Sequence, residues 1–315
     1  MAGIGLLLPI ALLTGLFFWF RASRGEAPPQ MPSRGRFSLL TEAVGYVGGL
    51  LMFAGGVAAL VQRWDDLSAA VRVGLLAGSA LVLLAIGFAT MRSSDPAAIR
   101  LTSVLWLLST AATAGAVAEL MTGVVEASDE TSFLVTAAVA TLWASVVYAL
   151  HRLTLQHLAL FVGVLVTALA AIQRIDPEAP GWIAGVVAWA IGLGWVALGE
   201  GNLVPPWWAA IPVGMLTALI APTAVDADST ATMFALGIGT AALLMAFSVR
   251  GKLVPGLALA SLGLFAYVTG AVVHYLGDPL GVPMALTLTG GLILVIAGIT
   301  ARLARFTRPP RLKAS

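Results

Sequence analysis

The chain has 315 residues, of which 59% are hydrophobic and only 10% are charged, and its formal net charge is +2. Soluble domains average about 25% charged residues, so this composition excludes a water-exposed globular domain as the main architecture. The sequence contains no cysteine, which excludes disulfides, thiolate metal sites and cysteine nucleophiles. The composition predicts a membrane protein.

The first apolar run covers residues 3–20, and the basic residues Arg21 and Arg24 follow it rather than precede it. A secretory signal has its positive charge before the apolar stretch and a small-residue cleavage site after it. We therefore expect an uncleaved transmembrane anchor at 1–20. The next segment, 21–40, is rich in proline and arginine and predicts a cytoplasmic linker.

Two apolar runs at 41–62 and 69–91 flank the charged turn RWDDLS. A helix rises ~1.5 Å per residue, so ~20 apolar residues cross a hydrocarbon core of ~30 Å. The stretch therefore predicts a transmembrane helical hairpin. Four more hairpins of the same kind follow, with predicted spans at 101–125 and 132–150, 158–173 and 181–199, 207–225 and 231–249, and 253–276 and 284–303.

The predicted fold is an all-α polytopic membrane bundle of about eleven transmembrane helices, one anchor plus five hairpins. The ten-helix bundle covers 41–303, and a basic cytoplasmic tail covers 304–315. This tail suits anionic lipid headgroups rather than nucleic acid. Membrane lipids are thus the expected partners, with a second copy of the chain or other membrane proteins as further candidates.

The basic residues predict the orientation of the bundle. Of the 17 lysines and arginines, fourteen fall on the side that carries the C-terminus, and the opposite side keeps only Arg63, Arg72 and Arg174. Because lysine and arginine resist translocation, the enriched side is expected to be cytoplasmic. This places the N-terminus outside and the C-terminus in the cytoplasm.

The first hairpin carries a family resemblance. Its motif residues are Glu42, Gly45, Tyr46, Gly48, Gly49, Gly55, Gly56, Trp64, Asp65, Asp66, Leu67, Arg72 and Gly87, followed by Arg100-Leu101 and Leu105-Trp106-Leu107-Leu108. This pattern, with the turn at 277–283, resembles the domain-of-unknown-function 2157 family of predicted bacterial multi-pass membrane proteins, and in particular its actinobacterial relatives. The resemblance implies a bacterial cytoplasmic-membrane protein and no established activity.

Glu119 is the best candidate for a functional carboxylate. It lies about 27 Å of helix rise from Leu101, near the outer boundary of the core, and the apolar run continues beyond it. A carboxylate at that depth is expected to face the bundle or a wet cavity, because lipid does not solvate it. Two candidate partners lie at a similar height, Arg72 in the third span and His274 in the tenth.

Small residues predict where helices pack closely. Gly45 and Gly49, and Gly181 and Gly185, recur at four-residue spacing, and Gly48 adjoins the first pair. In lipid, small faces let two helix backbones approach. We expect these positions to pack within the bundle, with a dimer seam or moving interface as the alternative.

No metal or cofactor site is predicted. His151 and His157 bracket the turn HRLTLQH, but two histidines without a further ligand do not make a metal site. No Asp, Glu, Lys or Arg falls at the centre of a predicted span, and no catalytic motif is present. We expect a non-enzymatic protein of envelope assembly or scaffolding; the alternative is a permease for a small apolar or lipid-like substrate, and an intramembrane enzyme comes last.

Overall fold

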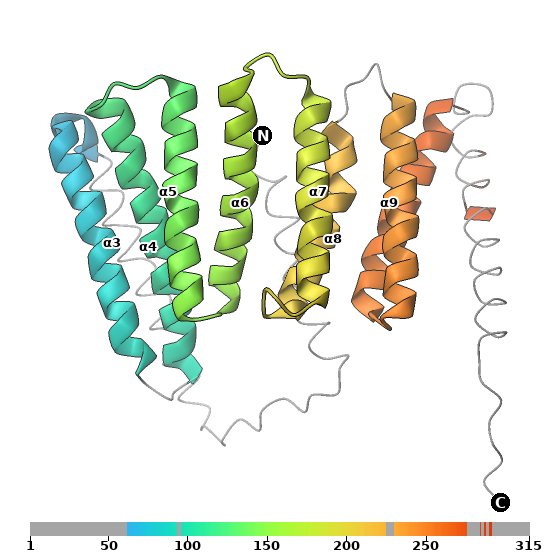
Figure 1. Ribbon diagram of the computed structural model, residues 1–315, viewed down its shortest axis with the longest axis horizontal. Helices are drawn as coiled ribbons and strands as arrows, with labels where there is room; N and C mark the ends of the chain where they lie inside the picture. The colour runs from blue at the N-terminus through green and yellow to red at the C-terminus, as the bar shows by residue number, and fades with distance from the viewer. Residues whose placement is uncertain are drawn as a thin grey trace, which may run out of the picture.

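The computed structural model describes residues 62–92, 96–224 and 230–275, with the single positions 284, 287, 290 and 291. This part of the chain is helical, and its long helices run side by side (Figure 1). Their bounds are α3 Ala69–Met91, α4 Pro96–Gly123, α5 Asp129–Leu150, α6 Thr154–Ile175, α7 Gly181–Glu200, α8 Trp207–Ile220, α9 Thr230–Arg250 and an unlabelled helix Val254–Tyr275. Two short 3-10 helices, η1 Trp64–Asp66 and η2 Ala221–Ala224, precede α3 and extend α8.

Eight helices in the described residues are long and apolar enough to cross a membrane, counting α8 with η2 as one. Their outward faces carry large apolar side chains such as Leu81 and Leu142, which are 60% and 65% exposed. Such surfaces suit lipid. The protein is therefore a multi-pass helical membrane protein.

The number of spans differs from the sequence expectation of eleven. Eight of the predicted spans are present as helices within the described residues. The other three, at 3–20, 41–62 and 284–303, fall outside those residues apart from isolated positions. The anchor, the linker at 21–40 and the tail at 304–315 also lie outside them.

Two boundaries depart from the predicted ones because of proline. Helix α4 begins at Pro96, five residues before the predicted start, and proline is favoured in the first turn because no helix bond needs its missing N–H. Helix α8 contains Pro212 and continues into the 3-10 turn η2, which includes Pro222. Proline supplies no backbone N–H and its ring crowds the preceding turn, so this span is a shorter α-helix than predicted.

Four tryptophans deep in the spans join neighbouring helices. Each donates its indole N–H to an acceptor on another helix, since in lipid an unpaired N–H is costly. The pairs are Trp106 with Leu84 O at 3.3 Å, Trp143 with Ser109 Oγ at 3.3 Å, Trp189 with Thr240 Oγ1 at 2.8 Å and Trp195 with His157 Nε2 at 3.0 Å. These hydrogen bonds connect α3 with α4, α4 with α5, α7 with α9 and α6 with α7.

The backbones of α7 and α8 approach closely at Gly192 and Gly214. A Cβ on Gly192 would lie 2.7 Å from the carbonyl oxygen of Gly214. The predicted packing glycine Gly185 also lies on α7, where a Cβ would lie 3.0 Å from the carbonyl oxygen of Ala221. Its predicted companion Gly181 is the first residue of α7. The other predicted packing glycines, Gly45, Gly48 and Gly49, lie outside the described residues.

Candidate functional site

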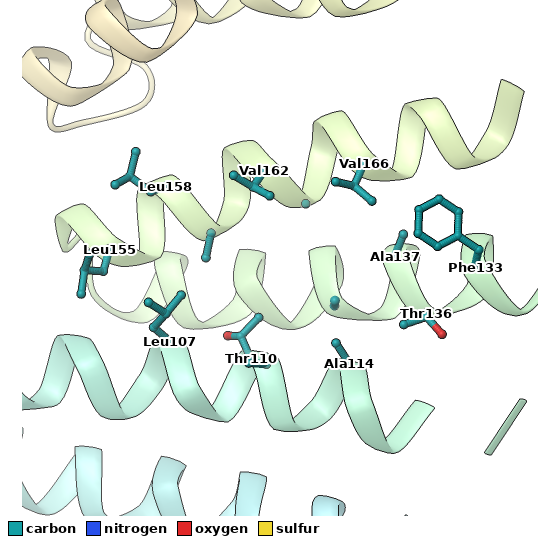
Figure 2. A pocket seen from close by; sticks show the side chains of 14 residues that line it. Leu107, Thr110, Ala114, Phe133, Thr136, Ala137, Leu155, Leu158, Val162 and Val166 are labelled. Carbon is teal, nitrogen blue, oxygen red and sulfur yellow. The ribbon is translucent and has the colours of Figure 1, made fainter. Parts of the chain in front are cut away.

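An apolar cleft of about 440 Å³ lies between α4, α5 and α6 (Figure 2). Sites for small molecules usually measure ~300–1,000 Å³ and are mostly apolar, so the volume suits a ligand. The lining residues are Leu107, Thr110, Ala111, Ala114, Phe133, Thr136, Ala137, Ala140, Leu155, Leu158, Ala159, Val162, Gly163 and Val166.

The cleft extends along the helices. Leu155 lies in the first turn of α6 and Phe133 in the second turn of α5, and these two antiparallel helices begin at opposite ends of the bundle. Thr110 and Ala140 line the cleft near the middle of α4 and α5. The cleft is not sealed, because Phe133 and Val162 are 48% and 53% exposed. It therefore passes through the middle of the spans and opens to the surface of the bundle.

The cleft offers a ligand almost no polar surface. Thr110 directs its hydroxyl to the backbone of its own helix, where it donates to Trp106 O at 3.0 Å. The hydroxyl oxygen of Thr136 is buried and has no hydrogen-bond partner among the described residues. Every other lining residue is apolar. The surface is thus suited to a hydrocarbon chain rather than to an ion or a sugar.

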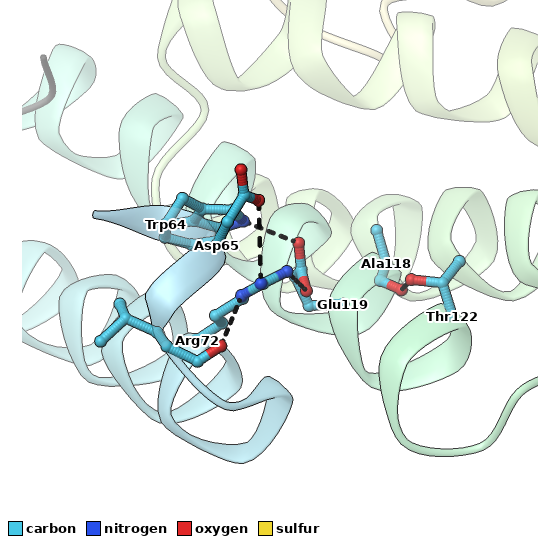
Figure 3. Close-up of polar contacts among 7 residues, drawn as sticks. Trp64, Asp65, Arg72, Ala118, Glu119 and Thr122 are labelled. Atoms are coloured by element: carbon cyan, nitrogen blue, oxygen red, sulfur yellow. Dashed lines mark hydrogen bonds and ion pairs between the residues drawn. The ribbon is translucent and has the colours of Figure 1, made fainter. Parts of the chain in front are cut away.

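Glu119 lies at one end of the α3–α4 hairpin and has partners on both carboxylate oxygens (Figure 3). Trp64 Nε1 donates to Glu119 Oε1 at 3.3 Å, and Arg72 Nη1 lies 3.7 Å from Glu119 Oε2. Arg72 also donates from Nε to Leu67 O at 3.1 Å, and its Cζ lies 5.5 Å from the centroid of the Trp64 ring. Asp65 lies 4.0 Å from Arg72 Nη2 and is fully exposed.

This cluster ties α3 and η1 to α4. Helix α4 ends at Gly123, so Glu119 lies about one turn below its end. The Glu119 and Arg72 side chains are 23% and 22% exposed, so the pair lies at the edge of the bundle. The expected contact between Glu119 and Arg72 is present, whereas a direct role of Glu119 in function stays a prediction.

His274, the other predicted partner of Glu119, lies elsewhere. It belongs to the helix Val254–Tyr275, where its ring centroid is 5.9 Å from that of Phe234 and 4.8 Å from that of Tyr275. This is an exposed aromatic group at the end of the helix. Glu119 and His274 were predicted to lie at a similar height in their spans. They do not meet, because their helices are not neighbours in the bundle.

A buried polar cluster around His157 was not predicted. His157 Nε2 accepts from Trp195 Nε1, and Nδ1 lies 3.3 Å from the carbonyl oxygen of Pro205. Because Nε2 accepts, the proton of the neutral ring belongs on Nδ1, which donates to Pro205. The hydroxyl of Tyr148 donates to the same carbonyl.

Gln156, the residue before His157, contacts a different neighbouring helix. Gln156 Nε2 donates to Ser103 O at 2.8 Å and Gln156 Oε1 accepts from Ser103 Oγ at 3.1 Å, which joins α6 to α4. Consecutive residues of α6 thus connect it to α4 on one side and to α7 and the loop before α8 on the other. The sequence signal was a Gln-His pair at the start of an apolar run.

His151 does not join His157. It is exposed after α5 and its ring centroid lies 5.8 Å from that of Trp106. Within the described ranges, no group of three or more His, Asp or Glu side chains is placed to hold a metal ion. The His157 cluster is therefore a connection between helices, and the cleft is the candidate ligand site.

Comparison with known proteins leaves the family resemblance as a prediction. No protein-family model, curated protein or solved structure matches this chain.

Proposed function

We propose that the protein binds a lipid-like apolar molecule in the cleft between α4, α5 and α6, and that it acts as a permease for such molecules rather than as an enzyme. The observation that carries this proposal is the cleft itself, about 440 Å³ of almost wholly apolar space. In a membrane its surroundings are lipid chains, so a chain is the molecule that can enter from the side. The cleft has lining residues near both ends of the spans, which suits passage along them.

The proposed location is the cytoplasmic membrane of a bacterium, with the N-terminus outside and the C-terminus in the cytoplasm. The distribution of lysine and arginine supports this orientation, and the family resemblance supports the bacterial membrane. Reporter fusions after Ser93 and after Asp129 test it, because the first should report the cytoplasm and the second the outside. A cytoplasmic signal from the second fusion would refute the orientation.

The permease proposal replaces scaffolding as our first choice, because a cleft through the middle of the spans favours a ligand. Envelope assembly stays a prediction from the sequence, and no feature of the described residues favours it specifically.

A cleft-filling variant tests the proposal. Ala140→Leu adds three carbons inside the cleft, whereas Ala138→Leu adds them to the exposed side of the same helix. The probe is a long-chain alcohol with a diazirine in its chain, added to the purified protein, and adducts are mapped by peptide mass spectrometry. Overpacking a filled space costs ~1–3 kcal/mol, so Ala140→Leu should weaken labelling of α4–α6 by about tenfold.

Ala138→Leu should label like the unchanged protein, and both variants should keep its melting temperature within a few degrees, which shows that folding is intact. Equal labelling of all three proteins, or adducts spread over the lipid-facing surfaces, would refute the proposal.

A further inference from the structure

Arg174 lies beyond the Phe133 end of the cleft. Arg174 lies in the last turn of α6 and donates from Nε to Thr131 Oγ1, on α5, at 3.0 Å. Thr131 precedes the cleft residue Phe133 by two positions, about 3 Å along α5, and Arg174 follows the cleft residue Val166 by about 12 Å along α6. A chain lying in the cleft would therefore end close to this guanidinium.

One hydrogen bond fixes the position of Arg174, and most of its N–H donors form no bond with other described residues. Thr131 is itself oriented by Ser128, the N-cap of α5, because its backbone N–H donates to Ser128 Oγ and its hydroxyl oxygen accepts from Ser128 Oγ. The Nε bond to Thr131 uses one of the five guanidinium donors. In the part of the chain that the structure describes, the two Nη groups have no hydrogen bond and no ion pair. Such a fork matches two oxygens of a phosphate.

The surroundings of Arg174 are acidic. Asp129 and Glu130 begin α5, and Asp176 and Glu178 follow α6; all four are exposed. Glu130 directly precedes Thr131, the residue that accepts the hydrogen bond from Arg174. A purely anionic headgroup bound to Arg174 would lie at an end of the bundle where the neighbouring segments of α5 and α6 are acidic. A headgroup with both a phosphate and an ammonium group is complementary to this arrangement, with the phosphate on Arg174 and the ammonium toward Glu130.

We infer that this end of the cleft binds a zwitterionic aminophospholipid. One acyl chain occupies the cleft, the phosphate binds the Nη groups of Arg174, and the primary ammonium group faces the acidic residues of α5 and the loop after α6. This inference rests on the proposed function, since it takes the cleft as the site of the chain. It names the headgroup class, which the apolar cleft by itself does not select.

The test compares two photoactivatable phospholipids with identical diazirine-bearing chains, phosphatidylethanolamine and phosphatidylglycerol, in vesicles that contain the purified full chain. The unchanged protein should label α5 and α6 with phosphatidylethanolamine about tenfold more strongly than with phosphatidylglycerol, as charge-assisted bonds of this kind predict. Arg174→Gln should weaken labelling of α5 and α6 by both lipids, because both carry the phosphate, and Arg174→Lys, which keeps the charge but not the fork, should weaken it less. Glu130→Gln, which removes a carboxylate facing the ammonium group, should reduce the preference for phosphatidylethanolamine.

Arg63→Gln is the matched control, because it removes an exposed arginine from the same predicted side of the membrane, away from the cleft. It should leave labelling by both lipids unchanged. Equal labelling of the unchanged protein by the two lipids, or stronger labelling by phosphatidylglycerol, would overturn the inference. Equal effects of Arg63→Gln and Arg174→Gln would overturn it too, because Arg174 would then be an ordinary interfacial arginine.

A competitor without acyl chains tests whether the headgroup alone accounts for binding. Excess glycerophosphoethanolamine should displace the labelled lipid poorly; displacement as effective as by the intact lipid would overturn the inference. The uncharged long-chain alcohol separates the two proposals. If it fails to label the cleft, the proposed function fails; if it labels the cleft and no headgroup preference is found, only this inference fails.

Discussion

Two groups of helices, α3 to α6 before the loop at 176–180 and those from α7 onward, differ in the contacts that hold each group together. Between α3 and α6, side-chain hydrogen bonds cross from helix to helix, as from Ser109 Oγ to Ala80 O at 2.8 Å and between the hydroxyls of Thr141 and Thr167 at 2.8 Å. From α7 onward, such hydrogen bonds are present too, as from Trp189 to Thr240, but the described part adds a buried apolar cluster and backbones that meet at glycine. The buried residues of that cluster are Val196, Ile211, Met215, Ala218, Leu219, Ala241, Leu244, Leu259, Ala260, Leu264 and Val268.

The difference matters because lipid chains remove the hydrophobic gain from helix association. Helices in a membrane then associate through dense packing or through hydrogen bonds. Dense packing fills the space between helices, as around Met215, which is fully buried. Hydrogen bonds act at points, so α4, α5 and α6 can be joined firmly at Gln156 and Thr141 and still leave a cleft between these points. The candidate ligand site thus lies outside the densely packed apolar cluster, among helices joined by hydrogen bonds.

The largest loss of stability is expected where the backbones of α7 and α8 meet at glycine. Gly192→Ala places a Cβ 2.7 Å from the backbone nitrogen of Ala218 as well as from Gly214 O, and neither backbone can yield cheaply. We expect a loss of about 1–3 kcal/mol of stability, measured as a lower melting temperature in detergent. Gly194→Ala is the control on the same helix, because a Cβ there meets nothing within 4 Å, and it should not lower the melting temperature. Equal melting of the two variants would contradict the close approach.

An effect of similar size is expected at the connection between the two halves. His157→Leu leaves the N–H of Trp195 unpaired, and Trp195→Phe leaves Nε2 of His157 unpaired, so each should cost about 1–3 kcal/mol. The double variant should cost clearly less than the sum, with a coupling of about 0.5–3 kcal/mol. Thermal unfolding of the four proteins measures this. Trp182→Phe, at an exposed tryptophan of α7, should change little; additive losses would show that His157 and Trp195 do not depend on each other.

The smallest effect is expected at Glu119. Glu119→Gln keeps an acceptor for Trp64 but removes the charge that faces Arg72, and partly exposed ion pairs contribute only ~0.2–1 kcal/mol. Melting temperature should fall slightly, and the fall should shrink at high salt, which screens the pair. Glu126→Gln, in the exposed turn after α4, is the control. Unchanged melting together with altered lipid labelling would instead support the role of Glu119 as a functional carboxylate.

The sequence by itself determined where the described spans lie. The eight observed helices coincide with predicted spans to within a few residues, because crossing ~30 Å of hydrocarbon sets the length of each apolar run without reference to its neighbours. The contact between Glu119 and Arg72 was also predictable, since the start of α3 and the end of the antiparallel helix α4 lie at the same height. Proline shifted the start of α4 and shortened α8, which the apolar run alone does not show.

Only the tertiary structure decided which helices meet and in what rotation. Nothing in the local pattern pairs Trp195 with His157, excludes His274 from Glu119, or brings Arg174 of α6 beside Thr131 of α5. A span that is apolar on every side has no polar face that reveals its orientation. The cleft, its length and the guanidinium beyond its end therefore follow from the packing of α4, α5 and α6, where glycines and hydrogen-bonding side chains select among many similar apolar surfaces.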